Sequence, residues 1–326
     1  MKKLNAVIVF PLVVLMTFLI AVMQPFGLSP DYANYEIFFD MVREEFGYDM
    51  TTRFEPGFVL ASGLLTSVIS SNAVVYGLLV ILAVIIKLFV LEKFVPSQKP
   101  LGRYYLYLAV VFYFVRFFPL HELTQLRAAL AAATVFLTLL FLWRGKRRKA
   151  IGVAVIAATL HYSSLMITPL LFVSRLSRRT VIIVAIAGMP LLYAASQAVV
   201  SVAGAYFAVF QTYEFGFAED RPNPLSPVFF PEFYLIAVSL IFWKDLTEMM
   251  RRIAVLQLLA FAIFYGLIDF SVVAVRGREL FSVLWTLYIV QASGASALVR
   301  YLLHVFVVAS IALSIYLYFI LNFFSK

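Results

Sequence analysis

Residues 123–173 read LTQLRAALAAATVFLTLLFLWRGKRRKAIGVAVIAATLHYSSLMITPLLFV and consist of two apolar runs on either side of a basic turn. The runs are Leu123–Trp143 and Ala150–Val173, and each is long enough to cross about 30 Å of hydrocarbon as a helix that rises about 1.5 Å per residue. The turn, Arg144–Lys149, is rich in Lys and Arg, which the positive-inside rule places in the cytoplasm. The stretch therefore predicts membrane-embedded helices.

The whole chain has the same character. Of its 326 residues, 63% are hydrophobic and 13% charged, and the mean hydropathy is +0.97, which excludes a water-soluble globular domain of this length. The net charge of +9 lies in short clusters between apolar runs, so it indicates membrane topology rather than nucleic-acid binding. The absence of cysteine excludes a disulfide framework and a thiolate metal site. The other apolar runs are Asn5–Gln24, Gly57–Ser71, Ala73–Leu91, Arg103–Phe118, Thr180–Ala203, Phe229–Trp243, Ile253–Phe270, Leu280–Ala297 and Tyr301–Phe324.

These runs predict an all-α polytopic membrane protein, with about 10–11 hydrophobic segments in a single transmembrane domain over residues 1–326. The basic start and the long first run indicate a retained first span, with the N-terminus in the cytoplasm and periplasmic loops at about 25–56 and 204–230.

Simple alternation across the membrane fails twice. Two apolar segments separate the periplasmic first loop from the basic stretch Lys93–Arg103, which also favours the cytoplasm. Arg144–Lys149 and Arg175–Arg179 both favour the cytoplasm, yet they flank the single segment Ala150–Val173. This segment is expected to be either a broken, re-entrant element that turns near His161 or a full span that violates the charge rule. Similarly, Gly57–Ser71 is expected to dip into the membrane and return.

Both periplasmic loops are acidic and aromatic. This composition suits a sugar-binding platform, but an ordinary interfacial helix or a plain connector has it too. The first loop ends in Arg53-Phe-Glu55-Pro-Gly-Phe58, where Pro and Gly stop the loop and place Glu55 at the mouth of the next apolar segment. The second loop carries Glu214 among its aromatic residues.

Arg127 lies about one helical turn inside an apolar segment. An arginine there costs roughly 2.5–3.5 kcal/mol on insertion scales, so it should face a cavity or an anionic partner, or else extend to the nearby interface. His121 with Gln125, and Glu122 with Arg116, predict a polar mouth just outside this segment.

His161 lies in the middle of an apolar segment, either as a satisfied core residue or as a base. The three histidines, His121, His161 and His304, have no metal-ligand spacing, so no metal site is expected. Arg276 and Arg278 lie at the outer end of adjacent segments, and their guanidinium groups suit diphosphate oxygens.

With these residues in view, the chain resembles the EpsG-type family of Wzy-like exopolysaccharide polymerases. One departure is Ala128, at a position after the arginine where the family often has Gln or another polar residue. The resemblance implies a GT-C-like, polyprenyl-sugar glycosyltransferase of the bacterial inner membrane that polymerises undecaprenyl-diphosphate-linked oligosaccharides on its periplasmic face. The matching pieces, in order, are Asp31-x-x-x-Tyr35, Glu55-Pro-Gly-Phe58, Arg127-Ala-Ala-Leu-Ala131, His161-x-Ser163-x-Leu165 and Arg278-Glu-Leu-Phe281.

Such a donor already carries a good leaving group, so catalysis needs cations that hold the diphosphate and a base that takes a proton from the acceptor hydroxyl. We expect no metal and no other cofactor. The expected diphosphate-binding residues are Arg127, Arg278, Arg276 and Arg53. The candidate bases are Glu55, Asp31 and His161, with Glu55 preferred because it lies at the membrane face where sugar and lipid meet. The expected substrate-binding residues are Tyr35, His121, Glu122 and Glu214.

The implied partners are the lipid-linked oligosaccharide, membrane lipid and other assembly proteins such as a chain-length regulator, with no nucleic acid. Two other classes stay open. A lipid-linked sugar transporter or flippase would show inverted repeats, and the sequence shows no such symmetry. A membrane O-acyltransferase would also place a histidine in a span.

Overall fold

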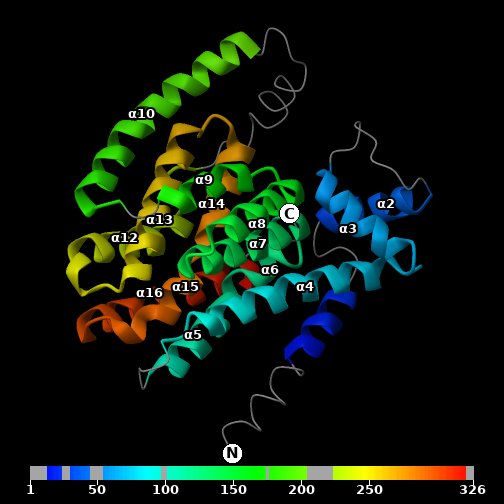
Figure 1. Ribbon diagram of the computed structural model, residues 1–326, viewed down its shortest axis with the longest axis horizontal. Helices are drawn as coiled ribbons and strands as arrows, with labels where there is room; N and C mark the ends of the chain where they lie inside the picture. The colour runs from blue at the N-terminus through cyan, green and yellow to red at the C-terminus, as the bar shows by residue number, and fades with distance from the viewer. Residues whose placement is uncertain are drawn as a thin grey trace, which may run out of the picture. The chain divides into compact units, whose positions relative to one another are not determined.

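The computed structural model describes residues 13–23, 30–44, 54–96, 101–173, 176–203 and 223–320 (Figure 1). All regular secondary structure in these ranges is helical, which confirms the predicted all-α fold. Among these residues, five helices are long and apolar enough to cross a membrane, so the chain is a multi-pass membrane protein. They are α4 (Asn72–Lys93), α7 (Leu126–Trp143), α10 (Arg178–Ala203), α13 (Glu248–Gly266) and α16 (Ala297–Ile315).

The chain divides into two compact units. The first contains Met1–Lys93, Val110–Leu165 and Ser314–Lys326, and the second contains Phe94–Ala109 and Met166–Leu313. The expectation of a single transmembrane domain stays a prediction.

In the first unit, α7 and α8 (Arg147–Leu160) form a hairpin whose two helices pack side by side (Figure 1). Buried alanines on both helices, such as Ala129 on α7 and Ala154 on α8, let the backbones approach closely. Gly145 closes the turn with a φ of 71°, a conformation that side chains disfavour. The basic turn therefore lies at the closed end of the hairpin.

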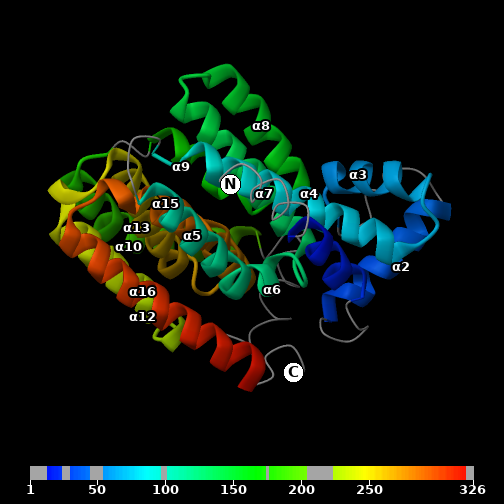
Figure 2. The same ribbon diagram turned by 90° about the horizontal axis from the view of Figure 1, so that it is seen from below.

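Two shorter helices, α2 (Pro30–Glu44) and α3 (Pro56–Thr66), pack on each other and on α4 (Figure 2). With 11 residues, α3 is about 16 Å long and too short to cross the hydrocarbon alone. Its expected dip into the membrane stays a prediction. The unit also contains the helix Val13–Val22 and the one-turn helix α6 (Phe118–His121).

The segment Ala150–Val173 is broken near His161, which is one of the two alternatives that the charge pattern left open. α8 ends at Leu160, His161 is extended with φ −161° and ψ 120°, and α9 (Ser164–Val173) begins three residues later. The helix thus ends directly before His161, the histidine within this apolar run. Whether the broken segment re-enters or spans the membrane stays a prediction.

In the second unit, the predicted apolar run Leu280–Ala297 is not one helix. It is divided among α14 (Ser271–Ser282), α15 (Trp285–Val290) and the 3₁₀ turn Gln291–Gly294. Every residue of α15 is buried within the protein, so this run is apolar because it packs in a protein core and not because it faces lipid. The unit also contains α12 (Phe230–Ile241) and the 3₁₀ turns Pro227–Phe229 and Trp243–Asp245, and α5 (Gly102–Arg116) lies partly in each unit.

Candidate functional site

One carboxylate joins three parts of the first unit. Glu55 Oε2 accepts a hydrogen bond from Arg127 Nη1 at 2.8 Å, and Glu55 Oε1 lies 2.8 Å from His161 Nδ1. The backbone N–H of Tyr162 also donates to Oε1, at 3.2 Å. The Glu55 side chain is 3% exposed, so this is a desolvated ion pair and not a surface contact.

The local sequence explains why Glu55 reaches the break after α8. Glu55 precedes Pro56, which begins α3, and its extended backbone turns the chain into the helix. A Cβ atom on Gly57 would lie 2.8 Å from the carbonyl oxygen of Thr159, so only glycine lets α3 approach α8 this closely. Thr159 is two residues before His161, and the close approach therefore sets the contact between Glu55 and the imidazole.

Arg127 is the second residue of α7, because the helix begins at Leu126 and not at the start of the apolar run. A cation at a helix N-terminus is electrostatically unfavourable, because it lies at the positive end of the helix dipole. The negative charge of Glu55 offsets this unfavourable interaction. The guanidinium lies 4.7 Å from the centre of the Phe54 ring, and the Arg127 side chain remains 27% exposed. The arginine is thus held by an anion and a ring while part of it stays accessible.

Tyr35 packs beside this ion pair. Its hydroxyl lies 3.5 Å from the backbone N–H of Arg127, and its ring contacts the rings of Phe54 and Phe58. Burial raises the pKa of the Tyr35 hydroxyl, which therefore stays protonated at neutral pH. Asp31 lies one turn earlier on α2 and is half-buried.

Glu55 is ionised over the whole physiological range. Burial alone would raise its pKa, but the hydrogen bond from His161 and the charge of Arg127 outweigh burial and lower the pKa to about 2. An ionised carboxylate can only accept hydrogen bonds, so His161 Nδ1 is the donor. The other ring nitrogen, Nε2, is buried and has no hydrogen-bond partner within the described part of the chain.

The polar mouth that the sequence predicted around His121 and Glu122 is not open, because both side chains are buried. His121 and Glu122 are both fully buried, and Glu122 forms an ion pair with Lys87 of α4, whose side chain is also fully buried. The sequence interpretation did not single out Lys87. The signal that could have identified Lys87 is its position as a lone lysine within the apolar run Ala73–Leu91, because a charge at membrane depth is costly without a partner.

The arginines near the end of the chain belong to the second unit. Arg278 Nη2 donates to Glu232 Oε1 at 2.9 Å, both side chains are buried, and the guanidinium lies 4.0 Å from the centre of the Phe229 ring. Arg276 is half-exposed, with its Nη1 3.9 Å from Glu279 Oε2. Two other residues expected in the site, Arg53 and Glu214, lie outside the described residues.

The structure thus brings together Glu55, Arg127, His161 and Tyr35 out of the expected site residues. No cluster of three or more His, Cys, Asp or Glu side chains that could hold a metal ion occurs within the described ranges. The chemistry that this group can perform rests on one anion, one cation and one imidazole.

Comparison with protein families matches residues 7–326 to the EpsG family. A search of curated proteins and a search of solved structures each found no match.

Proposed function

Because the chain belongs to the EpsG family, we propose that it polymerises undecaprenyl-diphosphate-linked oligosaccharide units into a surface polysaccharide such as an exopolysaccharide, capsule or O-antigen. Family membership suggests involvement in exopolysaccharide polymerisation. The observation that supports glycosyl transfer is the Glu55 carboxylate, which joins a partly exposed arginine to an imidazole with one free nitrogen.

In the proposed reaction, a hydroxyl of the incoming unit attacks the anomeric carbon of the growing chain. A glycosidic bond forms, the bond from that carbon to the lipid diphosphate breaks, and the hydroxyl proton passes to a base. The negative charge that develops on the leaving diphosphate is held by Arg127, whose planar guanidinium can donate two parallel hydrogen bonds. Neither the base nor the diphosphate site requires a metal.

We assign the base to His161 Nε2, which is buried in this structure and must become accessible to the acceptor hydroxyl during the reaction. Glu55 was the preferred base on sequence grounds, but a carboxyl group with a pKa of about 2 is a weak base, and its oxygens already accept three hydrogen bonds. Glu55 is better suited to hold Nδ1–H, which orients the ring and stabilises the imidazolium after proton transfer. Asp31 is the alternative base, one turn from Tyr35.

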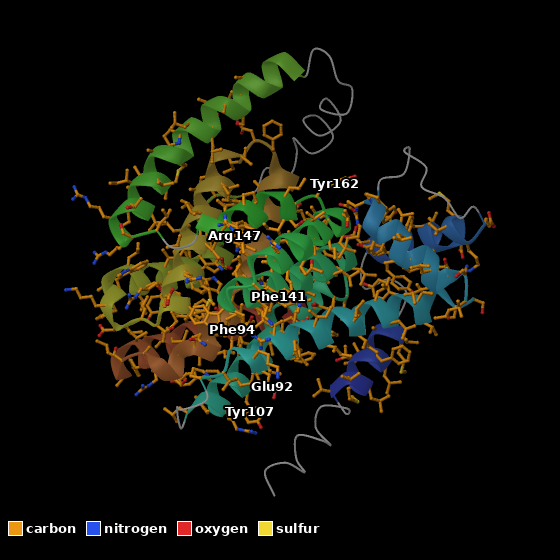
Figure 3. All side chains as sticks on the ribbon, viewed as in Figure 1. Glu92, Phe94, Tyr107, Phe141, Arg147 and Tyr162 are labelled. Carbon is orange, nitrogen blue, oxygen red and sulfur yellow. The ribbon has the colours of Figure 1, made fainter. Side chains whose placement is uncertain are left out.

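The same hairpin supports a reaction on the outer face of the bacterial inner membrane. Arg127 lies in the first turn of α7 and the basic turn follows the last residue of this helix, which is about 27 Å long. On α8 the order is reversed, with Arg147 at its start and Tyr162 just beyond its end (Figure 3). If the basic turn is cytoplasmic, as the positive-inside rule requires, Arg127 and His161 lie near the periplasmic face.

The test is elongation of undecaprenyl-diphosphate oligosaccharide by the purified protein in closed lipid vesicles. We expect a ladder of products on a gel, and loss of a single catalytic donor or base should lower the rate by about 10²–10⁴-fold. Arg127→Ala and His161→Ala are the variants to compare, with the exposed Val155→Ala on α8 as the control. Intact substrate that only crosses the bilayer would support a flippase, and acyl transfer would support an acyltransferase; either result overturns the proposal.

A further inference from the structure

The described part of the first unit contains a second buried ion pair that the proposed reaction does not use. Lys87 Nζ of α4 contacts Glu122 Oε1, and both side chains are completely buried. Removing two charges from water costs several kcal/mol per ion, so such a pair is a poor way to gain stability. In a membrane protein, a buried ionisable side chain is more often retained for function.

Glu122 lies where it can influence the position of Arg127. It lies in the short turn between α6 and α7, five residues before the arginine, and its backbone N–H donates to the carbonyl of Phe118. The next turn bonds continue into α7, with Gln125 N–H donating to His121 O and Ala129 N–H to Gln125 O. Glu122 thus lies within a hydrogen-bonded turn that continues into the first turn of α7, and we expect a shift of Glu122 to reach the guanidinium there.

α4 holds this turn at two points. Lys87 binds the side chain of Glu122, while the hydroxyl of Tyr76 donates to its backbone carbonyl at 3.0 Å. Tyr76 and Lys87 are eleven residues apart and lie on one buried helical face, together with Val80 and Ala83. The same Tyr76 ring packs against Tyr35, whose hydroxyl lies next to the backbone N–H of Arg127.

We propose that Lys87 is a positioning residue: its ion pair with Glu122 fixes the turn before α7 and thereby holds Arg127 against Glu55 in the geometry that receives the diphosphate. Lys87 itself touches neither substrate nor reacting atoms. The diphosphate part of this inference rests on the proposed function, whereas the placement of α7 relative to α3 does not.

The experiment uses the natural lack of cysteine in the chain. Spin labels at Leu64→Cys on α3 and Trp143→Cys on α7, both exposed positions, report the placement of α7 relative to α3. A second pair, Trp143→Cys with Val155→Cys on α8, reports the hairpin itself. Distance distributions are measured in lipid nanodiscs without substrate, and the affinity for inorganic diphosphate is measured separately.

The informative variant is Lys87→Met combined with Glu122→Gln, because it removes both charges while keeping the side-chain volumes. It should fold, broaden the distribution between α3 and α7, leave the hairpin distance unchanged and weaken diphosphate binding about tenfold. The exposed Lys93→Met at the end of α4 is the matched control and should change nothing. Lys87→Met alone leaves Glu122 without its cation, and we expect it to fold only where acid neutralises the carboxylate.

A charge exchange, Lys87→Glu with Glu122→Lys, should narrow the α3–α7 distribution again. If the doubly neutral variant keeps the wild-type distance distribution, the positioning role is wrong, whatever the diphosphate result. If the distribution broadens but the wild-type protein binds no diphosphate, Lys87 does position α7 and it is the proposed function that fails.

Discussion

At the scale of single residues, the Glu55 carboxylate links stability to pH. Its pKa falls from 4.5 in the unfolded chain to about 2 in the folded one, so the folded state is favoured when the group is ionised. This contribution is fully present above about pH 5 and is lost as the pH falls toward 2. The difference corresponds to about 3 kcal/mol.

We therefore expect Glu55→Gln to destabilise the protein at pH 7 by up to about 3 kcal/mol, and by progressively less below about pH 5. Thermal unfolding of both proteins in detergent across this range measures the effect. The exposed Glu92→Gln on α4 serves as the control. A constant difference between Glu55→Gln and wild type from about pH 7 to about pH 3 would contradict the assigned pKa.

For Arg278, the question is whether its role is structural or diphosphate-binding, because its side chain is buried against Glu232 in the second unit. Arg278→Ala leaves that carboxylate without its cation, and we expect destabilisation of about 3–5 kcal/mol. Arg278→Met combined with Glu232→Gln should recover much of the loss, as seen by thermal unfolding. Recovery of stability together with polymer formation would assign Arg278 a structural role, whereas a stable but inactive double variant would favour diphosphate binding.

At the scale of elements, the contact between α3 and α8 depends on the absence of a side chain at Gly57. In Gly57→Ala, the new methyl group meets the backbone carbonyl of Thr159, which cannot move without distorting α8. We expect α3 to shift, at a cost of about 1–3 kcal/mol, and Glu55 to lose its contact with His161.

The expected result is a loss of polymerisation by more than about tenfold at normal membrane insertion, measured by the elongation assay. Gly152→Ala on α8 is the matched control, because a Cβ there meets open space and alanine favours helix. Equal activity of the two alanine variants would show that the approach of α3 to α8 does not set the site.

At the scale of the whole molecule, the two ends of the α7–α8 hairpin should face opposite sides of the membrane. Single cysteines can test this directly in a chain that has none. Lys146→Cys in the basic turn and Tyr162→Cys beside His161 are both exposed positions. A membrane-impermeant thiol reagent should label the Tyr162→Cys variant in intact spheroplasts, and the Lys146→Cys variant only after lysis. Labelling of Lys146→Cys from outside would reverse the assigned face.

The membrane fold and the break at His161 could be predicted from the sequence because their causes are local. Hydropathy decides which segments enter lipid, and clustered lysines and arginines decide which ends stay in the cytoplasm. The same local reading singled out Glu55, Arg127 and His161, since a charged or ionisable group in or beside an apolar run is conspicuous.

Only the tertiary structure decided which of these groups meet. Glu55 is separated from Arg127 by 72 positions and from His161 by 106, and Lys87 from Glu122 by 35, so no periodicity in the sequence relates them. Burial of α15 was equally out of reach, because an apolar run has the same composition whether it packs against lipid or protein. Which charged side chains meet depends on packing in three dimensions. Gly57 lets α3 approach α8, and Lys87 pairs with Glu122, so these two residues decide contacts that the composition of the chain does not specify.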